Sequence, residues 1–374
     1  MIFSKTTTIG IIILGIIAII FLSRAVFRND FQLPRGGETR KETIVIQDGQ
    51  VVGKKETTDD IVRPPAAMEQ EKTEKVIKET FQETKEIMVT DGVKHSIPLN
   101  EIIGGGPPKD GIPSIDRPKF ISISEAGKQL SDTEPGLALE IGTVNRFYPF
   151  QILVWHEIVN DTINGKRVLV TYCPLCLSGI VFDPVVNGER VEFGTSGKLW
   201  NSNLVMYDRK TESLWSQILG EAIVGELTGT KLKVLSSDMV RFGDFKKLHS
   251  GGSVLSRDTG AARFYGQDPY GDYYTTPGTY FPVGKKDDRL NEKDFVLGIV
   301  INGKAKAYWP EAIKKMGKVE DRFENKTIVA QYEKDIDAVR LFEKRADGAV
   351  ERINPFSAFW FSWVAAHPDT ELLK

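Results

Sequence analysis

The stretch Val168–Asp183, with the sequence VLVTYCPLCLSGIVFD, decides how the rest of the chain is interpreted. It contains both cysteines of the protein, Cys173 and Cys176, separated by two residues. The β-branched and apolar residues before Cys173 predict a strand, and Gly179 to Phe182 predict a second strand immediately afterwards. The pair is therefore expected on a tight turn between two strands. Two thiols at this spacing favour redox chemistry or metal binding over unrelated buried thiols.

Length and composition predict an ordinary globular protein. The chain has 374 residues, enough for one to three domains with a large core. Hydrophobic residues make up 41% and charged residues 27% of it. The 49 basic and 51 acidic residues give a net charge of −2, and no basic stripe with interleaved aromatic residues occurs. We therefore expect no nucleic-acid partner.

The first 28 residues differ from this composition. Thr6 to Leu22 is an uncharged apolar run, preceded by Lys5 and followed by Arg24 and Arg28. Its length is near the lower limit for a transmembrane helix. No small-x-small cleavage site follows, so an uncleaved anchor over residues 1–28 is favoured over a cleaved signal or a buried helix. More Lys and Arg residues follow the apolar run than precede it, and this bias would keep the body in the cytoplasm. A single N-terminal span usually serves to export the rest of the chain, however, so we expect an extracytoplasmic body.

Residues 29–90 are polar and predict a largely disordered linker, with an interaction segment as the alternative. Gln47-Asp48-Gly49-Gln50 lies between two short apolar runs and indicates a small hairpin, because Asp-Gly suits a two-residue turn. The apolar faces of this hairpin are too small to fold alone.

The remaining chain predicts an α+β protein of mainly antiparallel strands with short helices. Helices are expected near Phe150 to Val159, Asp244 to Leu248, Pro310 to Met316 and Pro355 to Ala366. An internal sequence repeat divides the body into a first unit, 91–290, and a cysteine-free second unit, 291–374, which is expected to pack on the first. Tyr172-Cys173 in the first unit matches Tyr332-Glu333 in the second. Any chemistry of the thiols should then belong to the first unit.

Several long motifs lie between about Asp91 and Lys374. They are Gly105 to Pro113, Trp155 to Asp161, Tyr172 to Cys176, Ser202 to Arg209, Ser213 to Gln217 and Asp268 to Tyr274. In these motifs the chain resembles an exported bacterial and archaeal family, domain of unknown function 3179, and the resemblance implies no activity. Two positions differ from the family's usual pattern: Leu177 replaces a glycine after the second cysteine, and Ser250-Gly251-Gly252 follows His249 in place of Pro-Asp-Thr. The second difference weakens an essential role for His249.

A thiol-based metal site is the leading functional hypothesis. Cys-Pro-x-Cys on a tight turn lets two thiolates chelate one ion, and His156 is the best third ligand because an Asn-Gly turn folds its segment back beside the strand of Cys173. Glu157, Asp183 or His249 could provide a fourth ligand for zinc, whereas copper(I) accepts two or three ligands. The same residues allow His156 to be a hydrogen-bonded structural histidine instead.

Two other functional classes stay open. A thiol-disulfide redox protein fits an oxidising location, although a redox Cys-x-x-Cys usually opens a helix and here a strand follows. The other class is a non-catalytic binding or scaffold module whose thiols are inert. The glycine-rich segment Gly104 to Gly111 lacks the phosphate-loop pattern, and no dinucleotide fingerprint or hydrolase motif occurs. We therefore expect no nucleotide cofactor, and the substrate or protein partner is open.

Overall fold

The computed structural model describes residues 33–34, 37–55 and 82–374. Strands make up 46% and helices 12% of these residues, so the protein is mostly β and the expected α+β class is wrong. The smaller sheets are arranged in a way similar to a four-bladed β-propeller. The described helices have only three to seven residues and are η1 (Leu99–Glu101), α2 (Ile123–Ala126), α3 (Phe150–Leu153), η2 (Pro174–Cys176), α4 (Phe242–Leu248), α5 (Pro310–Met316), η3 (Lys334–Ile336) and α6 (Trp360–Ala366).

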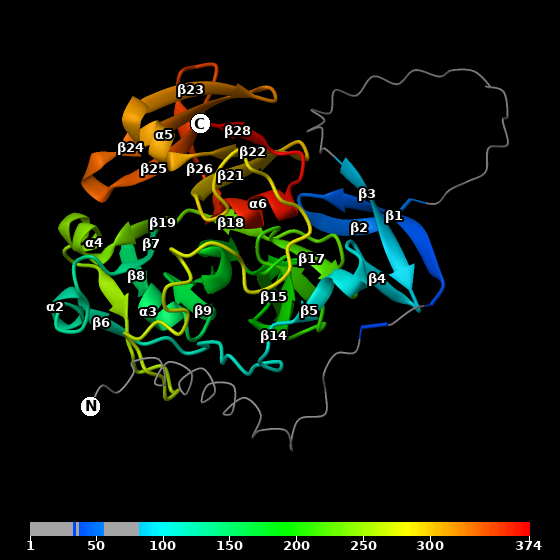
Figure 1. The fold of residues 1–374 in the computed structure, drawn as a ribbon, viewed down its shortest axis with the longest axis horizontal. Helices are drawn as coiled ribbons and strands as arrows, with labels where there is room; N and C mark the ends of the chain where they lie inside the picture. Colours follow the sequence, from blue (N-terminus) through cyan, green and yellow to red (C-terminus); the bar gives the residue numbers. More distant parts are fainter. Residues whose placement is uncertain (1–32, 35–36, 56–81) are drawn as a thin grey trace, which may run out of the picture.

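The largest sheet has nine antiparallel strands in the order β2-β1-β3-β4-β17-β16-β15-β14-β5. Part of the range expected to be a linker therefore forms strands, and the hairpin predicted at Asp48-Gly49 joins β1 to β2. Figure 1 shows β1 to β4 extending from one side of the molecule. The strands of this sheet are β1 (Thr39–Gln47), β2 (Gln50–Lys54), β3 (Gln82–Thr90), β4 (Val93–His95), β5 (Ile102–Gly104), β14 (Phe193–Trp200), β15 (Asn203–Asp208), β16 (Leu214–Ser216) and β17 (Glu221–Val224).

The first unit contributes two further sheets, with strand orders β19-β7-β8-β20-β6 and β18-β11-β10-β9. Asn164-Gly165 makes the two-residue turn between β9 and β10, as the sequence predicts. A small hairpin of β12 (Val185–Val186) and β13 (Glu189–Arg190) turns at Asn187-Gly188. The other strands are β6 (Phe120–Ser122), β7 (Pro135–Ile141), β8 (Val144–Pro149), β9 (Ile158–Ile163), β10 (Lys166–Cys173), β11 (Ser178–Asp183), β18 (Lys233–Leu235), β19 (Asp238–Arg241) and β20 (Ser253–Leu255).

The second unit has the sheets β27-β21-β22-β28 and β23-β24-β25-β26, which lie above those of the first unit in Figure 1. Their strand orders reproduce β19-β7-β8-β20 and β9-β10-β11-β18, and the pairs β8–β20 and β22–β28 are both parallel. The strands are β21 (Phe295–Ile301), β22 (Lys304–Tyr308), β23 (Lys318–Phe323), β24 (Lys326–Glu333), β25 (Ala338–Lys344), β26 (Val350–Ile353), β27 (Phe356–Phe359) and β28 (Glu371–Leu373).

Two predicted helices are shorter than expected. The helix expected to Val159 ends at Leu153, because Glu157 has a left-handed backbone with φ 57° and Ile158 and Val159 pair with β10. The residues after Pro355 first form β27 and become helical only at Trp360. In both places strand pairing overrides a helical spacing of apolar residues.

The largest hydrophobic cluster lies where the first unit, the nine-stranded sheet and the second unit meet. It contains Cys173 and Cys176, Trp200 and Leu204 from β14 and β15, and Trp363 from α6. The thiol turn is therefore inside the main core and not on an exposed loop.

Within the described ranges, no helix is long and apolar enough to cross a membrane. The anchor expected over residues 1–28 lies outside those ranges.

Candidate functional site

The two cysteines lie on a short 3₁₀ turn that joins β10 to β11. Cys173 pairs with Ser178 across the turn. Pro174 occupies the first helical position, which suits proline because a backbone N–H group there would have no hydrogen-bond partner within the helix. Leu177 closes the turn with φ 45° and ψ 38°, a left-handed conformation that favours glycine. The second unit repeats this geometry at η3, where Asp337 has φ 47° and ψ 42°. The turn is thus a shared scaffold, and the thiols are specific to the first unit.

Both thiols are free and fully buried, and they point at the same backbone oxygen. The Sγ atoms of Cys173 and Cys176 lie 3.9 Å and 3.3 Å from the carbonyl oxygen of Ser202. Ser202 occupies the two-residue turn between β14 and β15 together with Asn201, and both residues have positive φ, as a type I′ hairpin turn requires. The hairpin of the nine-stranded sheet therefore places its turn against the thiol turn.

The surroundings distinguish the two sulfur atoms. Burial and the neighbouring Cys176 raise the pKa of Cys173 well above its usual value. Burial acts on Cys176 in the same direction, but the neighbouring side chains of Cys173, Ser362 and Asn203 outweigh it and lower the pKa of Cys176. Of the two thiols, Cys176 is therefore the one that ionises more readily.

A buried polar network holds Asn203 in place. The Nδ2 of Asn203 donates to Oε1 of Gln217 at 2.9 Å, and its Oδ1 accepts from the backbone N–H of Ile218 at 3.1 Å. Gln217 in turn accepts from the hydroxyl of Ser178 at 2.6 Å and donates to the hydroxyl of Thr171 at 3.1 Å. This network fixes the amide beside Cys176 to the strands on both sides of the thiol turn.

Glu157 is a buried carboxyl group close to the thiols. It forms no ion pair or side-chain hydrogen bond with any residue that the structure describes, and burial raises its pKa to about 8. Its charge acts on both Cys173 and Cys176. Burial raises the pKa of Tyr270, and the nearby charges of Glu157 and Cys173 raise it further. A carboxyl group in this state can exchange a proton near neutral pH.

Tyrosines from the segment between β20 and β21 cover the thiol turn. Tyr273 is fully buried, and its hydroxyl donates to the backbone oxygen of Leu175 at 2.8 Å. Its ring packs against Tyr270 and Tyr280 and lies 3.6 Å from Nζ of Lys293. This segment contains no helix or strand, so the thiols lie beneath an irregular aromatic cover.

His156, the expected third metal ligand, is held by other groups. Its Nδ1 lies 2.7 Å from the carbonyl oxygen of Pro113, and its Nε2 lies 2.6 Å from the hydroxyl of Tyr265. Burial lowers its pKa. Both ring nitrogens are therefore already engaged, as in a structural histidine.

The other two expected ligands also have separate surroundings. Asp183 lies at the far end of β11 from the thiol turn, with Lys166 at 3.9 Å. His249 ends α4 and packs against Phe245, with ring centres 5.1 Å apart. Across the described part of the chain, no three His, Cys, Asp or Glu side chains form a group that could hold a metal ion. Of the predicted residues, the structure brings together Cys173 and Cys176, and Glu157 is near enough for its charge to act on both thiols.

Sequence reasoning missed Asn203, Gln217 and Ser362. Asn203 lies in the Ser202–Arg209 motif, and Gln217 lies in the Ser213–Gln217 motif. Each is a polar residue next to an apolar strand, and that position was the signal that could have identified them. Ser362 comes from α6 of the second unit, and nothing in its local sequence distinguishes it from other helical serines.

Comparisons with curated proteins and with solved structures found no significant match. One family model matches residues 109–370, which include the thiol turn, its network and most of the second unit. The chain therefore belongs to the family described as protein of unknown function (DUF3179).

Proposed function

We propose that this protein is a thiol-disulfide redox protein in which Cys176 attacks and Cys173 resolves. The observation that carries the proposal is the difference between the two sulfurs. Burial opposes ionisation of both thiols, but Cys173, Ser362 and Asn203 bring the pKa of Cys176 below its usual value, while the pKa of Cys173 stays raised. The thiolate is the reactive form in disulfide exchange. This assigns the attacking role to the second cysteine of the pair.

The reaction transfers two electrons from the pair to a substrate disulfide. The Cys176 thiolate attacks one substrate sulfur, breaks the substrate S–S bond and releases the first substrate thiolate. Cys173 then passes its proton to the carboxylate of Glu157, and its thiolate attacks the sulfur of Cys176. This forms the Cys173–Cys176 disulfide and releases the second substrate thiolate, which takes up the proton.

Glu157 gives this scheme a defined pH dependence. Because its pKa is raised to about 8, most Glu157 side chains are protonated at pH 7 and few can accept the Cys173 proton. The resolving step should therefore accelerate as the pH rises toward 8.

The test uses glutathione disulfide as the probe. We expect Cys173→Ser to accumulate a mixed disulfide at Cys176 in the folded state, because the resolving thiol is missing. Cys176→Ser should form little adduct, and the wild type should form an intramolecular disulfide. Intact mass measurement after acid quenching distinguishes these species. Equal adduct in the two variants, or no reaction of either, would overturn the proposal.

Binding of a soft metal ion is the second candidate, favoured by the convergence of both sulfurs on one side of the turn. Two thiolates suffice for copper(I), whereas zinc needs further ligands. Elemental analysis of reduced wild type beside the Cys173→Ser, Cys176→Ser double variant tests it. Metal bound equally or negligibly in both proteins removes this candidate. If neither test finds a role for the thiols, a non-catalytic binding or scaffold module is the alternative.

We also propose that the body is extracytoplasmic and attached to the membrane through the apolar run Thr6 to Leu22. An oxidising compartment supports reversible disulfide chemistry. Protease added to intact cells lacking an outer barrier should digest the body. Protection of the body until the cells are lysed would contradict this placement.

A further inference from the structure

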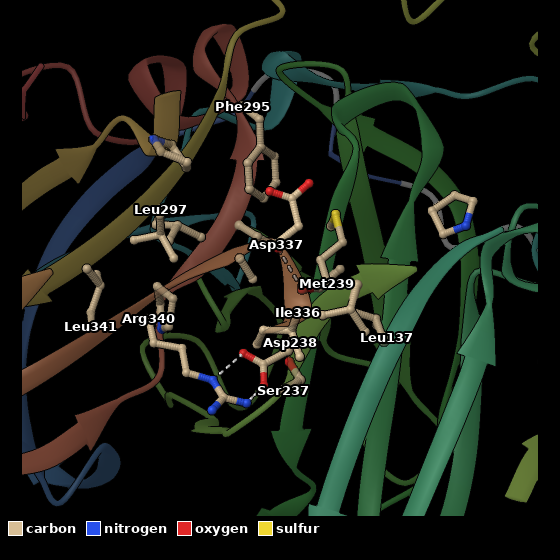
Figure 2. Close-up of a pocket in the computed structure, with 18 of the residues that line it drawn as sticks. Leu137, Ser237, Asp238, Met239, Phe295, Leu297, Ile336, Asp337, Arg340 and Leu341 are labelled. Carbon is tan, nitrogen blue, oxygen red and sulfur yellow. Dashed lines mark hydrogen bonds and ion pairs between the residues drawn. The ribbon is translucent and has the colours of Figure 1, made fainter. Parts of the chain in front are cut away.

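A cavity of about 430 Å³ lies between the two units. Figure 2 shows Leu137 and Met239 on one side of it and Leu297 and Leu341 on the other. The first two come from β7 and β19 of the first unit, and the other two from β21 and β25 of the second. Leu177, which follows Cys176 in the chain, also lines the cavity. Apolar residues from both repeats thus line part of its walls.

Two charged clusters accompany these apolar walls. Asp238 pairs with both Arg340 and Arg352 at 2.5 Å, as Figure 2 shows for Arg340. Asp337 pairs with Lys314 at 3.1 Å and more loosely with Arg241 at 3.7 Å. Each aspartate contacts two cations, so its single negative charge neutralises only one of them. Even with Glu311, which lies 3.5 Å from Lys314, the lining has four cations and three carboxylates.

One cation in this lining is available to an anion. The side chain of Arg241 is 59% exposed, so it can turn from Asp337 toward a bound anion. A cavity with apolar walls from both units and a surplus cation is complementary to a molecule with an apolar body and one anionic group.

We propose that this cavity binds a small amphipathic anion, a single apolar chain ending in a carboxylate. The apolar chain lies between the leucines of the two units, and the carboxylate meets Arg241. The volume falls within the usual range for small-molecule sites. This site is separate from the thiol chemistry and does not depend on it.

The experiment is calorimetric titration of the full chain in lipid nanodiscs, with octanoate as the probe and empty nanodiscs subtracted. Octanoate should bind the wild type, and octanol, which has the same chain without the charge, should bind about tenfold more weakly. Arg241→Ala should weaken octanoate binding about fivefold. Arg345→Ala is the matched control, because its side chain is 57% exposed and paired with Glu351 away from the cavity.

Filling the cavity tests its location. Met239→Trp should weaken octanoate binding at least about tenfold, and Ala338→Leu, a smaller addition to the same lining, serves if the tryptophan variant unfolds in a thermal melt. Three results would overturn the proposal: no binding of octanoate at millimolar concentration, equal binding of octanol and octanoate, or unchanged binding in a folded cavity-filling variant.

Discussion

Replacing Glu157 by glutamine should remove a large pH dependence of stability. The carboxyl group has a pKa of about 8 in the folded protein against 4.5 without burial. Its folded pKa is raised, so the folded state holds the proton more tightly than the unfolded state. Stability that is present below pH 4.5 is therefore lost as the pH rises toward 8, and no further loss occurs above it.

The size of the effect follows from the same shift. One pKa unit corresponds to about 1.4 kcal/mol, so ionising Glu157 costs the folded state up to about 5 kcal/mol, of which about 3 kcal/mol is lost by pH 7. This is a substantial part of the roughly 5–15 kcal/mol that stabilises a typical domain. Glutamine cannot ionise, so the variant should match the parent below pH 4.5, exceed its stability increasingly up to about pH 8, and keep that advantage at pH 9.

Urea unfolding at pH 5, 7 and 9 measures this difference. Both proteins should carry Cys173→Ser and Cys176→Ser, so that thiol ionisation does not contribute. Glu226→Gln is the control, because Glu226 is exposed. Parallel pH profiles of the parent and the Glu157→Gln variant between pH 5 and 9 would refute the reasoning.

Three further predictions concern the thiol site and the core. Asn203→Ala removes an amide that lowers the pKa of Cys176 and should raise that pKa by about one unit, measured from thiolate absorbance against pH. Gln217→Ala leaves several buried partners unsatisfied and should lower the free energy of unfolding by about 3 kcal/mol in urea titration. Gly298→Ala places a Cβ atom against the indole ring of Trp363 and should cost about 1–3 kcal/mol or more in the same assay.

Each of these predictions has a control or an excluding result. An unchanged Cys176 pKa in folded Asn203→Ala would show that the amide does not stabilise the thiolate. If Gln217→Ala lowers the free energy of unfolding by less than about 1 kcal/mol, the buried network does not contribute to stability as argued. Gly53→Ala is the matched control for Gly298→Ala, because a Cβ atom at residue 53 meets open space. Equal stability of the two alanine variants would contradict the packing argument.

Local chemistry made the turns predictable. Asp48-Gly49 and Asn164-Gly165 each form the two-residue hairpin turn that the sequence indicates, and Asn187-Gly188 forms another. Residues at these positions need positive φ, which asparagine, aspartate and glycine adopt at little cost. The strands beside the thiols were predictable for a similar reason, since β-branched residues dominate them.

Helix lengths were less predictable, because tertiary pairing decides them. Trp155 and Val159 have a helical spacing after Ile152, yet Val159 pairs with Val170 in the sheet. The chain leaves the helical conformation before that, at the left-handed Glu157. Where a short helix joins a strand directly, the spacing of apolar residues fits either structure. The helices were therefore expected to be longer than they are, which led to the wrong α+β class.

The companions of the thiols could not be predicted from proximity in the chain. His156 lies near Cys173 in sequence, but Pro113 and Tyr265 hold its ring. Asn203 and Ser362 reach Cys176 from a hairpin of another sheet and from the second unit. Such contacts depend on how the units pack, which no local pattern of residues records.

The most direct test of the redox account is an equilibrium titration of the folded protein against reduced and oxidised glutathione. Samples are quenched with an alkylating reagent, and the fraction of Cys173–Cys176 disulfide is read from intact mass. We predict a reversible two-electron transition in protein that stays folded by circular dichroism. If the thiols stay reduced at every glutathione ratio, or oxidise only after unfolding, the assignment of Cys173 and Cys176 as a redox pair is wrong.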